Sequence, residues 1–387
     1  MEGQLSRREN GAGNIYQRSN GTWVGRVKDG LGSDGKPRIK YFSGKTTAEV
    51  RRKIREYNKA GSQIDKKNVT VKEYILDWLT VYKKDALKQS SYDRLENTVQ
   101  HQIIPNIGMI PLQQLTSKDI QKLLNKLKKD GLSYSTIKKV YDCLNDVLRH
   151  AAIEDDIAKS PMLTVNMLKK EFFEQSEIEF FSREETALFI EECGKRFKNG
   201  TLVYGYGDVY VLMLNTGIRM GEAIGLLKSD WNKKEKTLHI QRNVQSVMKR
   251  NENGERVQGR ELIYNTTKTY SGDRIIPLNE NAENALKRLC DRFPDSKYIV
   301  CQRDGEIPPP DRIERTFYRI LKNLNIEKRG THSLRHTFAS MLFANDVDIK
   351  TISKLLGHAS IQITLNTYIH LFDKTDHNAV AKLDSIF

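Results

Sequence analysis

Residues 215–226 read NTGIRMGEAIGL, and this stretch organises the carboxy-terminal half of the chain. Apolar Val211, Leu212 and Leu214 precede it, so the glycine break predicts that Arg219 lies near the start of a new helix. A single basic residue in such a place is usually a surface residue. A functional role for Arg219 is therefore indicated only in combination with the motifs that follow it.

A lysine stands in the next motif, NTTKTYSGDRIIPL, at residues 265–278. The strand-like segments 262–264 and 274–276 flank it. This pattern predicts that Lys268 lies at the tip of a β-hairpin. The rest of the region mixes helices with a few strands.

Two further motifs are HSLRH at residues 332–336 and LLGHAS at residues 355–360. The first opens a helix on which His332 and Arg335, three residues apart, are neighbours. The second carries His358, and Tyr368 follows soon after it. Each motif alone is weak, because His358 fits a helix C-terminal cap and most tyrosines are core or rim residues.

Together these residue types suit attack by a phenol on a DNA phosphodiester. Arg219 and Arg335 can clamp the non-bridging oxygens, whose negative charge grows in the transition state. Lys268 can protonate the leaving 5′ oxygen, and the histidines can move the phenol proton or bind the phosphate. Tyr368 then carries the 3′ phosphate covalently, so rejoining needs neither ATP nor metal. The sequence thus predicts no cofactor.

In this order Arg219, Lys268, His332, Arg335, His358 and Tyr368 resemble the active site of the tyrosine recombinases. The resemblance extends over nearly the whole chain. An acidic residue after the first arginine also fits the family pattern, in which it helps to orient the site, and Glu222 stands there.

The layout is similar to integrases of conjugative transposons and temperate phages. The resemblance implies a DNA strand transferase that drives integration and excision of a mobile element. It implies double-stranded DNA, with core and arm sites, as the substrate, and a homotetramer that acts through a Holliday junction. An excisionase and host DNA-bending proteins are the further partners it implies, and the tail 373–387 would pack on a neighbouring subunit or close its own domain.

The amino-terminal region predicts three strands and a helix. Residues 14–18 and 22–28 flank Asn20-Gly21, a strong hairpin signal, and 38–43 follows as a third strand. A helix begins near Thr46. Such a sheet can enter a DNA major groove, and the candidate contacts are Arg26, Lys28, Arg38 and Lys40.

The middle of the chain predicts an all-helical domain, with polar linkers near 61–68 and 160–179. The whole is expected to be a multidomain α+β protein. Its predicted parts are a three-stranded arm-binding domain over 1–67, a helical core-binding domain over 68–165 and a mixed α/β catalytic domain over 175–387.

Composition agrees with a polyanionic partner. Among 387 residues, 64 Lys and Arg against 49 Asp and Glu leave a net charge of +15. Residues 1–67 hold 16 basic and 7 acidic side chains, which is +9 of that total. The four cysteines form no metal or disulfide pattern, and no apolar run is long enough to cross a membrane, so a cytoplasmic protein without a signal peptide is expected.

Other readings explain less. The segment 30–37 resembles a phosphate-binding loop, but Pro37 stands where Ser or Thr must hold magnesium. His332 and His336 have the spacing of zinc ligands, yet the glutamate of that motif is absent. A DNA-binding regulator, a relaxing topoisomerase and a metal-dependent transposase stay as alternatives, of which the last leaves the motif series unexplained.

Overall fold

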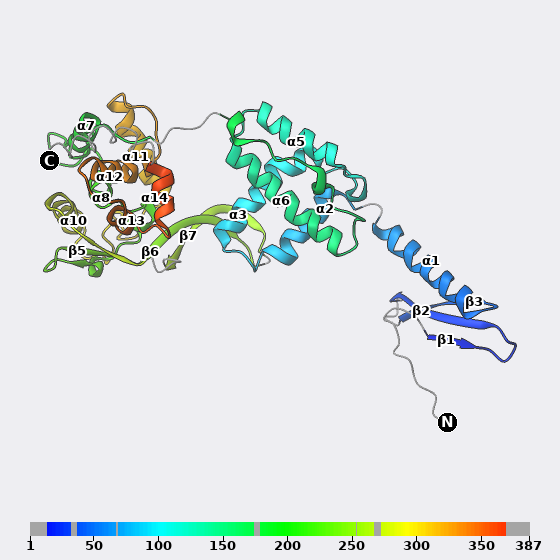
Figure 1. Cartoon of the computed structure of the whole chain (residues 1–387). Coiled ribbons are helices and arrows are strands. Elements are labelled where there is room, and N and C mark those ends of the chain that lie inside the picture. The colour runs from blue at the N-terminus through cyan, green and yellow to red at the C-terminus, as the bar shows by residue number, and fades with distance from the viewer. Residues whose placement is uncertain are drawn as a thin grey trace, which may run out of the picture. The chain divides into compact units, whose positions relative to one another are not determined.

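The computed structural model (Figure 1) describes residues 14–31, 37–66, 69–173, 179–252, 254–266 and 272–368. The chain divides into two compact units, Met1–Phe173 and Glu174–Phe387. The predicted combination of a small sheet, a helical region and a mixed α/β region is confirmed. Within the described residues, no helix combines the length and the apolarity that crossing a membrane requires.

The first unit begins with an antiparallel sheet of order β1-β2-β3. Its strands are Asn14–Gln17, Trp23–Leu31 and Pro37–Gly44, and helix α1 (Thr47–Lys66) follows. The helix packs so closely on β2 that a Cβ at Gly25 would lie 2.6 Å from Ile54 Cδ1. Residues 61–66, expected as a polar linker, instead continue α1, so that prediction is wrong.

The register of this sheet separates the predicted DNA contacts. Arg26 pairs with Tyr41, and Val27 pairs with Lys40. Directly opposed residues share a face and neighbours alternate, so Arg26 and Lys40 lie on opposite faces. The Lys40 ammonium lies 4.2 Å from the ring centroid of Tyr57 on α1. Lys28 and Arg38 lie on the same strands, but their side chains are outside the described ones.

The remainder of the first unit is helical. A capping box starts it, in which Thr70 N–H donates to Glu73 Oε2 at 2.8 Å and Glu73 N–H to Thr70 Oγ1 at 3.2 Å. The α-helices are α2 (Val71–Trp78), α3 (Gln89–Thr98), α4 (Ile104–Ile107), α5 (Ser117–Lys129) and α6 (Tyr134–Ile153). Two π-helical segments, η1 (Leu79–Lys83) and η2 (Val99–Ile103), follow α2 and α3, and the 3₁₀ turns are η3 (Leu112–Gln114), η4 (Pro161–Thr164) and η5 (Lys170–Phe172).

The segment after α6 is part of this helical core. Met162 and Val165 are buried in it, and Phe173 packs against it. Residues 160–173 were expected to belong to a linker. That expectation is wrong because the apolar side chains of this segment pack into the core, where η4 contacts α5 and α6.

The second unit mixes helices with two small sheets, of order β4-β5-β8 and β6-β7. Its strands are β4 (Trp231–Asn232), β5 (Thr237–Ile240), β6 (Arg242–Arg250), β7 (Arg256–Thr266) and β8 (Arg274–Pro277). Its helices are α7 (Arg183–Cys193), α8 (Gly207–Thr216), α9 (Met220–Ile224), η6 (Lys228–Asp230), α10 (Glu280–Arg292), α11 (Pro310–Asn323), α12 (His332–Ala344), α13 (Ile349–Leu356) and α14 (Ile361–Tyr368).

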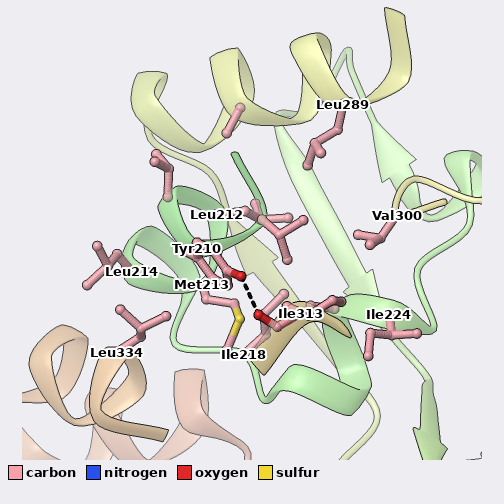
Figure 2. Packing of buried hydrophobic residues seen from close by; sticks show 14 of the residues in the cluster. Tyr210, Leu212, Met213, Leu214, Ile218, Ile224, Leu289, Val300, Ile313 and Leu334 are labelled. Atoms are coloured by element: carbon pink, nitrogen blue, oxygen red, sulfur yellow. Dashed lines mark hydrogen bonds between the residues drawn. The ribbon is translucent and has the colours of Figure 1, made fainter. Parts of the chain in front are cut away.

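Helix α8 is buried nearly throughout and forms the centre of the second unit's core. Figure 2 shows this packing, in which the Tyr210 phenol donates to the Ile313 carbonyl at 2.6 Å among apolar side chains. The phenol thus has its hydrogen-bond partner inside the core, as burial of a polar group requires. The site described below is built on the end of this rigid helix.

The strand pairing corrects the expected hairpin around Lys268. β7 pairs with β6 along its length, whereas β8 pairs with β5. The strands on either side of Lys268 therefore belong to different sheets, and β6 (Arg242–Arg250) supplies the partner strand of β7. Lys268 itself is outside the described residues.

We expect Gly217→Ala to destabilise the second unit strongly. Gly217 has φ +64°, and an added Cβ would lie 2.4 Å from Phe338 Cδ1. The left-handed backbone and the steric overlap together should cost about 2–4 kcal/mol. Gly200 has φ +80° with nothing within 4 Å, so Gly200→Ala should cost only about 1–2 kcal/mol. Urea unfolding followed by circular dichroism measures both, and equal losses would contradict the steric part.

Candidate active site

Arg219 stands at the turn between α8 and α9. Its backbone N–H donates to Glu222 Oε2 at 2.9 Å, and its Nη1 donates to Glu222 Oε1 at 2.9 Å. The carboxylate thus satisfies an N–H group at the helix start and holds the guanidinium. The Arg219 side chain remains 39% exposed, so its outer edge is open to a ligand.

Glu222 also binds a second arginine, in the interior. It is 3% exposed, and Arg274 on β8, 7% exposed, donates to it through Nη2 at 2.9 Å and Nη1 at 3.3 Å. Burial alone would raise the pKa of Glu222, but the hydrogen bonds and charges of Arg274 and Arg219 outweigh it and lower the pKa. Arg274 Nε donates further to the Leu355 carbonyl at 2.7 Å.

Arg335, on α12, is almost completely buried, with 1% exposure. Its Nη1 donates to the Gly217 carbonyl at 2.8 Å and its Nη2 to the Leu356 carbonyl at 2.6 Å. Burial, followed by the charge of Arg219, lowers the pKa of Arg335 to about 9. Arg335 remains a cation at neutral pH and links the end of α8 to the end of α13.

His332 and His358 lie in the electrostatic field of these arginines. Desolvation by surrounding atoms and then the charges of Arg335 and Arg219 lower the pKa of His332 to about 4, although His332 is an exposed residue. The same causes lower the pKa of His358 to about 3. The ring nitrogen Nδ1 of His358 lies 2.7 Å from Thr364 Oγ1. Both imidazoles are therefore neutral at pH 7.

Tyr368 ends helix α14 and is only 2% exposed. Its hydroxyl lies 2.9 Å from Nδ1 of His336, one residue after Arg335. Burial raises the pKa of Tyr368 to about 12, although the charge of Arg335 opposes the shift. The phenol is therefore protonated at neutral pH.

The structure brings five of the six predicted residues into one neighbourhood. The buried Arg335 connects them, because it binds carbonyls two residues before Arg219 and two residues before His358, and it adjoins the partner of Tyr368. His332 lies on the same helix as Arg335, at the first position. Lys268 is outside the described residues, so its place relative to the other five stays a prediction.

Sequence reasoning missed two residues of this neighbourhood, Arg274 and His336. Arg274 was noted only as a strand residue, although it binds Glu222. His336 was weighed only as a zinc ligand. In the described part of the chain, no three His, Cys, Asp or Glu side chains gather as metal ligands, and the rings of His332 and His336 meet edge to face at 4.8 Å. The signal for His336 was its i, i+4 spacing from His332, which puts both on one side of the helix.

The assembled groups suit an oxyanion. Arg219 and Arg274 bind the carboxylate of Glu222, and Arg335 lies within its electrostatic reach, which leaves a surplus of positive charge beside neutral imidazoles and a phenol. Guanidinium groups match the geometry and charge of phosphate.

Comparisons with known proteins agree with this architecture. Residues 204–375 match the phage integrase family, and residues 70–128 match the phage integrase N-terminal SAM-like domain. The "Tyrosine recombinase XerC-like" protein of Caldanaerobacter subterraneus subsp. tengcongensis is 29% identical over 95% of this chain and 97% of its own length. The integrase of Staphylococcus phage L54a is 24% identical over 85% of this chain and 96% of its own length.

Solved structures share the fold. The Tn1549 transposon integrase in complex with a circular intermediate DNA superposes with a TM-score of 0.65 at 20% identity, covering 82% of this chain and 100% of that one. A lambda integrase dimer bound to a core site superposes with a TM-score of 0.59 at 17% identity, covering 94% and 96%. The chain belongs to the tyrosine recombinases of the phage integrase family and is a site-specific DNA recombinase.

We expect Glu222→Gln to destabilise the second unit, because it removes the charge that offsets the buried Arg274. Breaking a buried ion pair on one side typically costs about 3–5 kcal/mol. Glu283→Gln is a matched control, since the Glu283–Lys236 pair is largely exposed on the lysine side at 67%, and it should cost at most about 1 kcal/mol. Urea unfolding compares the two variants, and similar losses would show that Arg274 does not depend on Glu222.

Proposed function

We propose that this recombinase is the integrase of a mobile genetic element and that Tyr368 is its nucleophile. The Tyr368 oxygen attacks the scissile phosphorus, the bond from phosphorus to the 5′ oxygen breaks, and a 3′-phosphotyrosine forms. The phenol loses a proton and the departing 5′ oxygen gains one. The observation that carries the proposal is the placement of Tyr368 beside the helix that holds His332 and Arg335.

The arginines are the proposed ligands of the phosphate. Arg335 directs two of its five N–H groups to the Gly217 and Leu356 carbonyls, which sets the orientation of the guanidinium plane. Arg219 has its orientation set by Glu222 while its side chain stays partly exposed. A preoriented cation loses little on reorganising around the charge that develops on the phosphate oxygens.

The remaining roles concern protons. His332 and His358 are neutral, so each can donate one hydrogen bond to a phosphate oxygen or accept a proton. Lys268 is the proposed acid for the 5′ oxygen. We propose no metal and no cofactor, because the phosphotyrosine conserves the energy of the broken bond for rejoining.

We propose double-stranded DNA with core and arm sites as the substrate and a homotetramer as the active assembly. Related integrase structures hold DNA, and one is a lambda integrase tetramer bound to a Holliday junction. Residues 1–67 would bind the arm sites, while 68–165 and 175–387 would hold the core site. An excisionase and host DNA-bending proteins are proposed as further partners, and the cytoplasm as the place of the reaction.

Covalent trapping tests the nucleophile. The full chain is incubated with nicked duplex DNA carrying the ends of the element that encodes it, in the presence of a chelator. We expect an adduct that survives denaturing electrophoresis and maps by peptide analysis to Tyr368. Tyr368→Phe should form no adduct yet bind the DNA within a few-fold of wild type in a gel shift. Tight binding by wild type without an adduct would refute the proposed function.

The sheet register tests the arm-binding proposal. Arg26 shares a face with the exposed Tyr41, whereas Lys40 lies on the face that carries α1. We expect Arg26→Ala to weaken binding of the full chain to arm-site DNA and to reduce the slope of log K against log salt by about 0.9 for each lost phosphate contact. Lys40→Ala should leave the slope unchanged. An equal effect of the two variants would contradict the proposal that DNA binds the face of the sheet that carries Arg26.

A further inference from the structure

We infer that His336 is the positioning residue of the nucleophile: its Nδ1 accepts the hydrogen bond of the Tyr368 phenol and so holds the attacking oxygen beside the phosphate-binding groups of the same chain. This inference rests on the proposed function of Tyr368. It assigns His336 no contact with DNA, because His336 acts through the tyrosine.

The contacts of His336 connect the nucleophile to the site. Its Nδ1 lies 2.9 Å from Tyr368 Oη, and the two ring centroids are 5.8 Å apart at 66°. Its ring also meets that of His332 edge to face, with centroids 4.8 Å apart. His336 therefore contacts both the proposed phosphate ligand His332 and Tyr368.

The protonation states of both rings are compatible with a hydrogen bond from the phenol to the imidazole. Burial, then the neighbouring His332 and Arg335, lower the pKa of His336 to about 4, so its ring is neutral at pH 7. The Tyr368 pKa of about 12 keeps the phenol protonated. We assign the tautomer with the imidazole proton on Nε2, in which Nδ1 accepts from the phenol.

The position of His336 on α12 explains why the contact orients the attack. Arg335 precedes it directly and is buried with both Nη groups bound to backbone carbonyls. A rigid helix thus carries a phosphate ligand and the partner of the nucleophile on adjacent residues. Tyr368 itself stands at the last position of α14, where the phenol needs a partner on a firmer element to keep its place.

Two carboxamide variants separate a hydrogen bond at Nδ1 from a general need for histidine. The amide group of His336→Asn falls near the position of Nδ1, whereas that of His336→Gln falls near Nε2. The measurement is the first-order rate of adduct formation on the nicked element-end duplex at saturating protein. A misplaced reacting atom typically slows a reaction by about 10- to 100-fold. We expect that loss for His336→Ala and His336→Gln, with DNA affinity unchanged, and a rate near that of wild type for His336→Asn.

A rate for His336→Asn no higher than that for His336→Gln would overturn the inference. An unchanged or faster reaction of His336→Ala would also overturn it, since the contact would then be idle or would restrain the tyrosine. The wild-type adduct separates the proposed function of Tyr368 from the proposed role of His336. If wild type forms no adduct, the proposed function is wrong. If wild type forms the adduct and the His336 variants react at the same rate, only the role of His336 is wrong.

Thermal stability supplies a readout without activity. His336→Gln should lower Tm in the wild-type background more than in the Tyr368→Phe background, where the phenolic hydrogen bond is already gone. A role of His336 in packing alone predicts the same drop in both backgrounds, and that result would overturn the inference.

Discussion

The end of helix α13 is held by two buried arginines, and the candidate site depends on this arrangement. Arg274 donates to the Leu355 carbonyl at 2.7 Å and Arg335 to the Leu356 carbonyl at 2.6 Å. Carbonyls in the last turn of a helix lack helical partners and carry partial negative charge, so cations stabilise them. Glu222 in turn neutralises Arg274 and binds Arg219. One network thereby ties α9, β8, α12 and α13 together.

The charge of this network is not balanced. Glu222 is the one carboxylate that the described contacts place among Arg219, Arg274 and Arg335. Desolvation first, and then the charges of Arg335 and Arg219, lower the pKa values of the neighbouring His332 and His358 and keep both imidazoles neutral. An anion that enters the site supplies the missing charge.

The sequence anticipated much of the site and part of its geometry. Arg219, His332, Arg335, His358 and Tyr368 were recognised from their chemistry and order, and the structure places them near one another. Glu222 was recognised only through the family resemblance. Arg274 and His336 were not recognised as members of the site, because the partners that give them meaning, Glu222 and Tyr368, are 52 and 32 residues away in the chain. Spacing along one element cannot reveal such a partner.

Short sequence patterns were sufficient to predict structures whose interacting groups are close together in the sequence. The predicted Asn20-Gly21 turn is present, and the capping boxes at Thr70 and Ser182 likewise form from groups three residues apart. Pairing between strands is decided by distant segments competing for the same backbone groups. The sequence therefore determined the helices, the small sheet and the order of the chemical groups. Only the tertiary structure decided that β7 pairs with β6 instead of β8, that Arg26 and Lys40 face opposite ways, and that buried arginines join the site. Each of these outcomes depends on which segment, distant in the sequence, covers the residue and removes it from water.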